Sequence, residues 1–378
     1  MKPSVILLVL FACNLQAQKP PVFATGLLNP SKIILTPAGN LLVSETGTKP
    51  NTGRISIIDK SGVRKTLIDG LPSGLAAPNM DADGPNGMLV QGNALFLLNG
   101  EGDGFRNGSL PNTIVPNPGG PSSPLFSSLM KLTLAGSVDA AAGGFVMTPA
   151  HHASLADGNS VTLTDSTGTT ATLEMVTDFR DGVADPVTVW RNSHPYGLTA
   201  LDSRPDKLYV ADAGMNVVYE VTVSTGRSRV MTRFAPLPNP AGAPGPPVSD
   251  AVPDSIRPYG DQLLVSVLHG FPFPQGGSQV YLVEPKTGTA TPFITNLTSA
   301  IDVATITQGL NRPVFFTLEY STNQLAGMLG RVTRYDTAQG KVIADGLAGP
   351  TNLAYDAASQ TLYVLSHDDG TVLKVSGQ

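Results

Sequence analysis

Cysteine is nearly absent from this chain, which has one such residue, Cys13, among 378. A single cysteine cannot form a disulfide within the chain and offers no pair of thiolates for a metal or redox site. Charged residues are also scarce, at 14%, and the net charge of -5 comes without any basic run interleaved with aromatic residues. A phosphate-reading surface needs such a run, so we expect no nucleic-acid partner.

Two common catalytic motifs are missing as well. The chain has no Gly-x-Ser-x-Gly elbow and no glycine-rich phosphate loop followed by Lys and Ser or Thr. Their absence removes the simplest serine-hydrolase and nucleotide-binding interpretations. Because no assembled catalytic set is visible, the sequence favours a binding function over an enzymatic one.

The N-terminus has the features of a secretory signal. Met1-Lys2-Pro3 gives a positive start, Val5 to Ala12 form a short apolar core, and Leu15-Gln16-Ala17 precede Gln18 as a candidate cleavage site. The pattern predicts a signal peptide over residues 1–17 with cleavage after Ala17, and the apolar run is too short to span a bilayer. The alternative is a lipoprotein signal with Cys13 acylated. Both interpretations predict a secreted or periplasmic protein without a transmembrane segment.

The rest of the chain is rich in glycine (40 residues), proline (32) and hydrophobic residues (41%), which indicates many short strands joined by tight turns. One sequence pattern recurs: a proline or small residue, an apolar strand, a Gly or Asp turn, a second apolar strand and a polar end. Six copies run through residues 29–45, 84–99, 194–212, 252–266, 300–319 and 349–366. Repetition of a unit that buries its faces only against its neighbours predicts an all-β, six-bladed β-propeller.

Two further strand-like runs follow each pair, which predicts four-stranded antiparallel blades. The last copy is short of a strand, so we expect the apolar segment 21–27 to close the ring by pairing with it. Residues 18–378 then form a single domain, in which the second blade carries insertions at about 100–128 and 143–185. Such a ring buries its own core, so we expect a monomer.

Polar residues gather where the innermost strand of each repeat begins and the next strand ends. In antiparallel neighbours these two points lie at the same end of the sheet, so the side chains should surround one mouth of the central channel. The predicted ligand-binding set is Asn86, His194, Asp212, Asp254, His269, Asp302, Glu319, Asn352 and His367, with Glu45 and Asn99 at equivalent positions.

Oxygen-rich ligands of this kind favour Ca²⁺, with Asp254 and Asp302 as the best candidate metal ligands. The alternative is that these Asp and Asn residues only begin turns by bonding their own backbone. The segment Asp81-Ala82-Asp83-Gly84 lacks the later ligands of a calcium loop, so we interpret it as a turn. His151 and His152 have no carboxylate at metal spacing and are interpreted as a solvated loop pair.

Four aromatic residues of the same segments could form a rim that stacks on an aromatic or sugar ligand, or could instead pack between blades. They are Tyr196, Phe271, Phe273 and Tyr320.

Three strings carry a family resemblance: 193–198 (Ser-His-Pro-Tyr-Gly-Leu), 208–214 (Leu-Tyr-Val-Ala-Asp-Ala-Gly) and 270–274 (Gly-Phe-Pro-Phe-Pro). With them, nearly all of residues 18–378 resemble the ScyD/ScyE family of the scytonemin gene cluster, and the single units also resemble NHL repeats. The resemblance implies an exported six-bladed propeller. It implies no catalytic residue set.

Three functions therefore stand as hypotheses. The first is a noncatalytic binding or scaffold propeller whose loop-bearing face engages a protein, a glycan or a small aromatic ligand. The second is a lactonase-like or esterase-like hydrolase that uses a divalent metal in the channel; Lys32, near the mouth, would oppose that cation. The third, implied by the family name, is an extracytoplasmic helper in the synthesis of an indole-phenol pigment.

Overall fold

A computed structural model describes residues 18–76, 81–109, 114–179, 182–183, 191–307 and 312–376. The predicted signal peptide, residues 1–17, lies outside the described residues. In the described part of the chain, no helix is long and apolar enough to cross a membrane.

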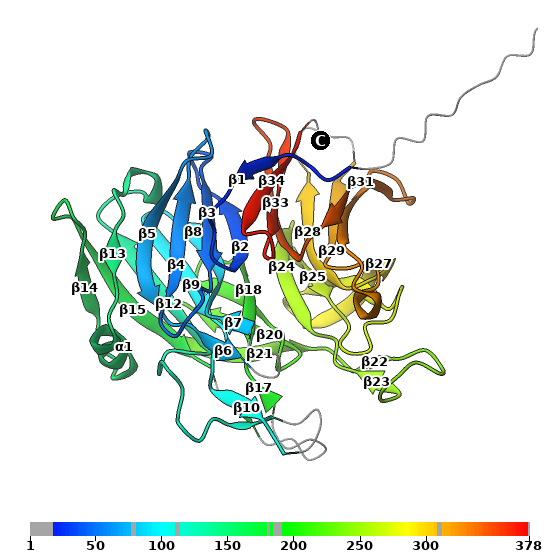
Figure 1. Ribbon diagram of the computed structural model, residues 1–378, viewed down its shortest axis with the longest axis horizontal. Coiled ribbons are helices and arrows are strands. Elements are labelled where there is room, and N and C mark those ends of the chain that lie inside the picture. Colours follow the sequence, from blue (N-terminus) through cyan, green and yellow to red (C-terminus); the bar gives the residue numbers. More distant parts are fainter. Residues whose placement is uncertain are drawn as a thin grey trace, which may run out of the picture.

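The structure is nearly all β and confirms the six-bladed propeller (Figure 1). Six antiparallel blades surround a central channel, each with its first strand innermost. The first three blades are β2 (Pro30–Leu35), β3 (Leu41–Glu45), β4 (Gly53–Ile58) and β5 (Arg64–Leu71); β8 (Pro85–Gln91), β9 (Ala94–Asn99), β12 (Ser128–Leu134) and β15 (Thr170–Asp178); and β18 (Pro195–Ala200), β19 (Lys207–Asp212), β20 (Val217–Thr222) and β21 (Arg227–Arg233).

The last three blades complete the ring. They are β24 (Pro253–Tyr259), β25 (Gln262–Val267), β26 (Ser278–Glu284) and β27 (Thr289–Leu297); β28 (Ala300–Ile306), β29 (Val314–Glu319), β30 (Gly330–Tyr335) and β31 (Lys341–Leu347); and β32 (Pro350–Asp356), β33 (Thr361–Ser366), β34 (Thr371–Ser376) and β1 (Val22–Ala24).

Strand β1 is the outermost strand of the sixth blade, as the sequence predicted. It pairs antiparallel with β34, with Val22 opposite Leu373 and Ala24 opposite Val372. Two backbone hydrogen bonds extend the junction, from Lys374 N to Pro21 O (2.9 Å) and from Leu27 N to Gly370 O (3.1 Å). The N-terminal and C-terminal segments therefore share one blade.

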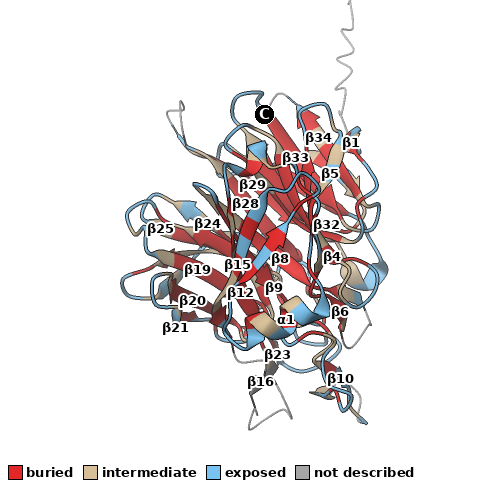
Figure 2. Ribbon diagram, turned by 90° about the vertical axis from the view of Figure 1, so that its left-hand side faces the viewer, coloured by how far each residue is buried: buried red, intermediate tan, exposed pale blue. Residues whose placement is uncertain are grey.

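Neighbouring blades cover both faces of the second strand of each blade. Every residue of β3, β9 and β33 is buried, and Figure 2 shows the buried residues concentrated in the strands. Apolar residues of adjacent blades share clusters; one joins Leu365 of the sixth blade to Ile33 and Val43 of the first, with Ala24 of β1 beside them. Because each face is buried only against its neighbour, the blades depend on the closed ring.

Four connections lie at one end of the propeller, along the lower edge of Figure 1. They carry small hairpins of their own: β6 (Gly74–Ala76) with β7 (Asp81–Asp83), β10 (Phe105–Asn107) with β11 (Ile114–Pro116), β16 (Gly182–Val183) with β17 (Arg191–Asn192), and β22 (Leu237–Pro238) with β23 (Val248–Ser249). This is also the end at which the innermost strands begin, so the loops surround the channel mouth.

The insertions of the second blade differ in position from those that the sequence predicted. The segment expected as an insertion at 143–185 includes β15, which is the fourth strand of the blade itself. The true additions are β13 (Phe145–Val146), which joins the first blade in parallel, helix α1 (Pro149–Ala156) and the fifth strand β14 (Val161–Thr164).

Two interpretations of short segments were wrong. His152 is not solvated: it is buried in α1, with Nδ1 3.1 Å from Ser123 Oγ and Nε2 2.9 Å from Gly70 O, while His151 completes the N-terminal cap of the helix. Residues Asp81 to Asp83 form strand β7 rather than a turn, because they pair with β6.

Candidate functional site

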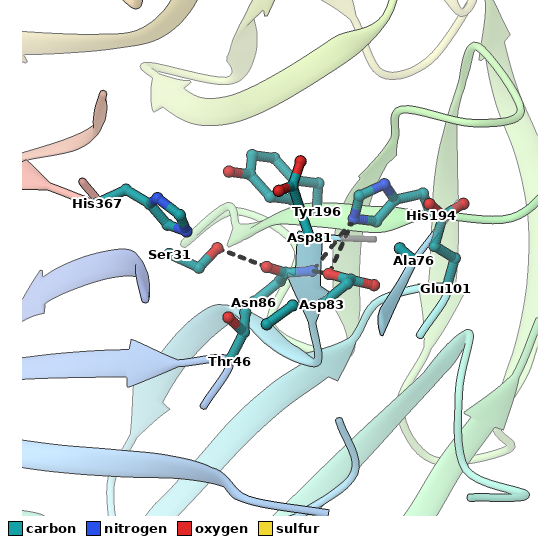
Figure 3. A pocket seen from close by; sticks show the side chains of 11 residues that line it. Ser31, Thr46, Ala76, Asp81, Asp83, Asn86, Glu101, His194, Tyr196 and His367 are labelled. Carbon is teal, nitrogen blue, oxygen red and sulfur yellow. Dashed lines mark hydrogen bonds and ion pairs between the residues drawn. The ribbon is translucent and has the colours of Figure 1, made fainter. Parts of the chain in front are cut away.

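A cavity of about 230 Å³ lies at the loop-bearing mouth of the channel (Figure 3). Its walls come from the first, second, third and sixth blades and from the hairpin β6–β7. The lining residues are Ser31, Thr46, Ala76, Asp81, Ala82, Asp83, Asn86, Glu101, His194, Tyr196 and His367. Of the predicted residues, the structure brings Asn86, His194, Tyr196 and His367 together here.

An ion pair between Asp83 and His194 forms one wall of the cavity. Asp83 Oδ1 lies 3.2 Å from His194 Nε2 and also accepts a hydrogen bond from Asn86 Nδ2 (3.1 Å). Its other oxygen, Oδ2, accepts from the backbone N–H of Gly102 (2.8 Å). Burial alone would raise the pKa of Asp83, but the His194 charge and these hydrogen bonds hold it below its usual value.

His194 is a stable imidazolium in this setting. Burial acts to lower its pKa, but Asp83, Glu101 and Asp212 together raise it to about 10. Asp212, fully buried behind it, fixes the segment by accepting from the His194 backbone N–H (2.9 Å). Since Nε2 is directed at Asp83, and Nδ1 has no hydrogen-bond partner within the described ranges, the imidazolium keeps one N–H available to a ligand.

Glu101 supplies a free carboxylate near this imidazolium. It follows β9, is half-buried, and has no side-chain hydrogen bond or ion pair to any described residue. Burial and the charges of Asp83 and Asp212 outweigh the attraction of His194 and raise the pKa of Glu101 to about 7. The cavity therefore offers an acceptor and a donor that the described residues leave unused.

Two glycines beside Glu101 allow the loop to approach Asp83 so closely. A Cβ on Gly100 would lie 2.2 Å from Asp83 Oδ2, and one on Gly102, whose φ is +54°, would lie 2.1 Å from the Phe126 ring. Any side chain at either position would displace Asp83 or the loop. The segment Gly100-Glu101-Gly102 is thus shaped to deliver the Glu101 carboxylate to the mouth.

Below the cavity, Tyr196 separates the mouth from a buried lysine. The Lys32 Nζ lies 3.6 Å from the centre of the Tyr196 ring and donates to the backbone carbonyl of Asp254 (3.0 Å). Burial lowers the pKa of Lys32 to about 7 and raises that of Asp254 to about 7. Asp254 Oδ2 is buried without a partner in the described chain.

Asp302 and Asn352 lie deeper and belong to a structural network. Arg257 holds Asp302 by two contacts, Nε to Oδ1 (3.1 Å) and Nη2 to Oδ2 (2.6 Å), and Nη2 also donates to Leu353 O (2.8 Å). Asn352 donates to Asp302 Oδ2 (2.7 Å) and accepts from Ile33 N (2.9 Å). These bonds join the first, fourth, fifth and sixth blades across the channel.

The carboxylates at the ends of second strands serve a repeated structural purpose. Glu45, Asp212 and Glu319 each accept a backbone N–H from the connection that leads into their own blade, at Leu28 (2.6 Å), His194 (2.9 Å) and Thr298 (2.7 Å) respectively. Glu45 and Glu319 are also paired with Arg54 and Arg331. Asn99 has the same position in the second blade and donates to Ser128 Oγ (3.0 Å).

The remaining predicted residues lie outside the cavity lining. His269 is buried between Gly277 O (3.0 Å) and Asn239 Oδ1 (2.9 Å). Phe271 is exposed and meets Phe273 edge-on at 6.1 Å, while Tyr320 packs against the apolar cluster of the fifth and sixth blades. Only Tyr196 of the expected aromatic rim lines the cavity.

Among the described residues, no group of three or more His, Cys, Asp or Glu side chains has the arrangement of a metal site. The sequence missed Asp83 and Glu101 as members of the cavity, because each lies in a loop insertion outside the repeated sequence pattern.

No family model matches the chain, and no curated protein matches it either. Solved structures do match it as a fold. The PQQ-bound aldose sugar dehydrogenase of Streptomyces coelicolor has a TM-score of 0.53 and 13% identity, over 96% of this chain and 98% of that one. A protein of Thermus thermophilus described as a candidate oxidoreductase (glucose dehydrogenase) has a TM-score of 0.51 and 12% identity, over 94% and 99%. At such identities the similarity shows the propeller fold alone.

Proposed function

We propose that this protein is a ligand-binding propeller that holds a small polyhydroxylated molecule, a sugar, in the cavity at the channel mouth. The observation that carries this proposal is the free carboxylate of Glu101 near the free N–H of His194. Adjacent hydroxyl groups of a sugar can donate to the carboxylate and accept from the imidazolium, so one diol satisfies both. The proposal itself requires no bond-breaking step.

The cavity suits a sugar better than a flat aromatic ligand. Its volume of about 230 Å³ accommodates a molecule of monosaccharide size, and its lining supplies hydroxyl, amide, carboxylate and imidazole groups. Tyr196 is the only Phe, Tyr or Trp among the described lining residues; Lys32 covers one face of its ring, and His194 meets the ring edge-on at 5.3 Å. Stacking on an indole-phenol is therefore disfavoured, which weakens the pigment-helper hypothesis.

The lining also fits PQQ poorly. PQQ carries three carboxylic acid groups, and a site for it needs several cationic partners. The described lining has three carboxylates, on Asp81, Asp83 and Glu101, no lysine or arginine, and an imidazolium that is already paired with Asp83.

The expected calcium ion, and the hydrolase that would use it, stay predictions with little support from the donor set. Both oxygens of Asp302 already accept from Arg257, and Lys32 lies beside Asp254. A metal bound by Asp302 would have to displace Arg257, and a metal bound by Asp254 would lie close to the side chain of Lys32. Export of the protein and membership of the ScyD/ScyE family likewise remain proposals, the latter supported by the string at residues 270–274.

Ligand-observed NMR and calorimetry with a panel of monosaccharides and polyols test the binding proposal. We expect at least one sugar to bind, and Glu101→Ala to weaken it about 10- to 100-fold, because a charged hydrogen bond is lost. Glu174→Ala is the matched control, since Glu174 lies on the outer part of the second blade and, among the described residues, forms an ion pair only with Lys131. Failure of every sugar to bind at tens of millimolar would overturn the proposal.

A further inference from the structure

Binding a sugar would not by itself require that one cavity hold a carboxylate without a partner, Glu101, and an imidazolium, His194, whose Nδ1–H has no partner among the described residues. Glu101 and His194 come from different blades, the second and the third, and they do not form a direct ion pair with each other. Each is therefore free to act on a molecule that lies between or against them. This arrangement is the minimum needed for simultaneous acid and base catalysis.

We propose that this site interconverts the α and β anomers of a reducing sugar, with Glu101 as the base and His194 as the acid. The inference rests on the proposed function, because it requires that the cavity binds a sugar. It replaces the sequence-based expectation of a noncatalytic protein.

The reaction needs only the two side chains and the sugar. The Glu101 carboxylate removes the proton of the anomeric hydroxyl O1 while His194 Nδ1–H gives its proton to the ring oxygen O5. The C1–O5 bond breaks, its electron pair stays on O5, and C1=O1 becomes an aldehyde. After rotation about C1–C2, the O5 hydroxyl attacks the other face of C1, the imidazole recovers its proton, and protonated Glu101 returns a proton to O1.

No oxidant, reductant or metal enters this balance, and both groups end as they began. The electrostatics of the cavity suit the roles. With a pKa of about 7, Glu101 is basic enough to take a proton yet largely ionised above neutrality, and with a pKa of about 10, His194 is protonated at the same pH. The reaction begins with Glu101 ionised and His194 protonated, which are the states that these pKa values favour.

Asp83 is a positioning residue for this chemistry. By holding Nε2 it fixes the imidazole ring and directs Nδ1 elsewhere, and it is itself held by Asn86 and the Gly102 N–H. Because these bonds are made by the protein's own groups, the acid is oriented before a sugar arrives.

Polarimetry of freshly dissolved α anomers tests the inference, using the sugar that the binding assay identifies. We expect the protein to raise the rate of approach to anomeric equilibrium above that of buffer alone. Glu101→Gln and His194→Gln should each lower the protein-catalysed rate about 10²- to 10⁴-fold, the usual contribution of a general acid or base. Glu174→Gln, on the outer part of the second blade, should leave it unchanged.

The outcomes separate the two proposals. If a sugar binds to the wild type but its anomers equilibrate no faster than in buffer, the catalytic inference is wrong and the binding proposal stands. If no sugar of the panel binds, both fail. Glu101 has no partner to lose among the described residues, so Glu101→Gln should fold; an unchanged melting temperature with an unchanged rate would also overturn the inference.

Discussion

A buried imidazolium needs a counter-charge, and in this cavity that counter-charge is Asp83. Burial opposes the charged form of His194, whereas Asp83 favours it both through its charge and through the contact of 3.2 Å. The charges of Glu101 and Asp212 add to the effect. The protonation of His194, and with it the donor offered to a ligand, therefore depends chiefly on one carboxylate.

Asp83→Asn should lower the pKa of His194 from about 10, because it removes the negative charge that chiefly opposes the effect of burial. The chain has five histidines, so their ring resonances can be followed individually by NMR titration.

The raised pKa of His194 also means that its pair with Asp83 stabilises the fold below pH 6.5 and loses this contribution as the pH rises through about 10. The variant should therefore be more destabilised at pH 6 than at pH 10.5 or above. A wild-type His194 that titrates near 6.5 would contradict the assignment.

Sequence reasoning could find His194 and Asn86 because both stand at the start of an inner strand, a position that the repeat defines. It could not find Glu101 or Asp83. Glu101 lies in the long connection after β9, and Asp83 in a small hairpin before β8, where no periodicity constrains the chain. Only the glycines at positions 100 and 102 signal the close approach, and a glycine pair in a loop is compatible with many conformations.

At the level of the blades, the same polar positions have two different uses. The ends of the second strands hold Glu45, Asp212 and Glu319, which the sequence assigned to the mouth together with the other polar groups. In the structure these carboxylates bond backbone N–H groups of their own blades. The repeat predicted where these residues lie, but the choice between ligand binding and backbone capping depends on side-chain direction, which the pattern does not encode.

Between blades, the pair of Arg257 and Asp302 is the principal polar connection across the channel. Asp302 is fully buried and accepts from Arg257, Asn352 and the backbone of Leu353. Removing either charge would leave the other unpaired in the channel. We expect Arg257→Met or Asp302→Asn to lower the free energy of unfolding by about 3–5 kcal/mol, measured by denaturant titration.

The double variant Arg257→Met with Asp302→Asn should recover much of that loss, because no isolated charge remains. A control on the half-buried pair of Lys131 and Glu174, on the outer part of the second blade, should change stability by about 1 kcal/mol or less. Losses that simply add in the double variant would show that the two charges are not coupled.

At the scale of the whole molecule, the number of blades and the closing strand were predictable because they follow from counting. A repeat that is short of a strand at its C-terminal end requires a partner, and the apolar segment before the first repeat supplies it. The loop insertions were located only roughly, since β15 of the second blade lies inside one of them. A strand displaced from its copies by a long connection no longer carries the spacing that identifies it.

The closing strand should matter more for stability than its three residues suggest, because it joins blades at the two ends of the repeat array. Ala24 and Leu27 are buried, and their cluster includes Ile33 of the first blade and Leu365 of the sixth. Deletion of residues 18–28 would expose this cluster and leave the β34 edge unpaired. We expect the melting temperature to fall by roughly 5–10 °C, measured by calorimetry.

Two further variants distinguish the effect of opening the ring from the effect of losing residues. Deleting only residues 18 and 19, which are both exposed, removes the surface pair of Lys19 and Asp369 (2.7 Å) and should change the melting temperature little. In a circular permutant, residues 18–28 follow Ser376 through a short glycine-serine linker, so that β1 forms a hairpin with β34 in the antiparallel register already present. This permutant should recover most of the stability lost on deletion, since β1 again pairs with β34 and packs on the first blade. If it melts as early as the truncated chain, the connection from β1 into the first blade, and not its pairing with β34, is what holds the ring.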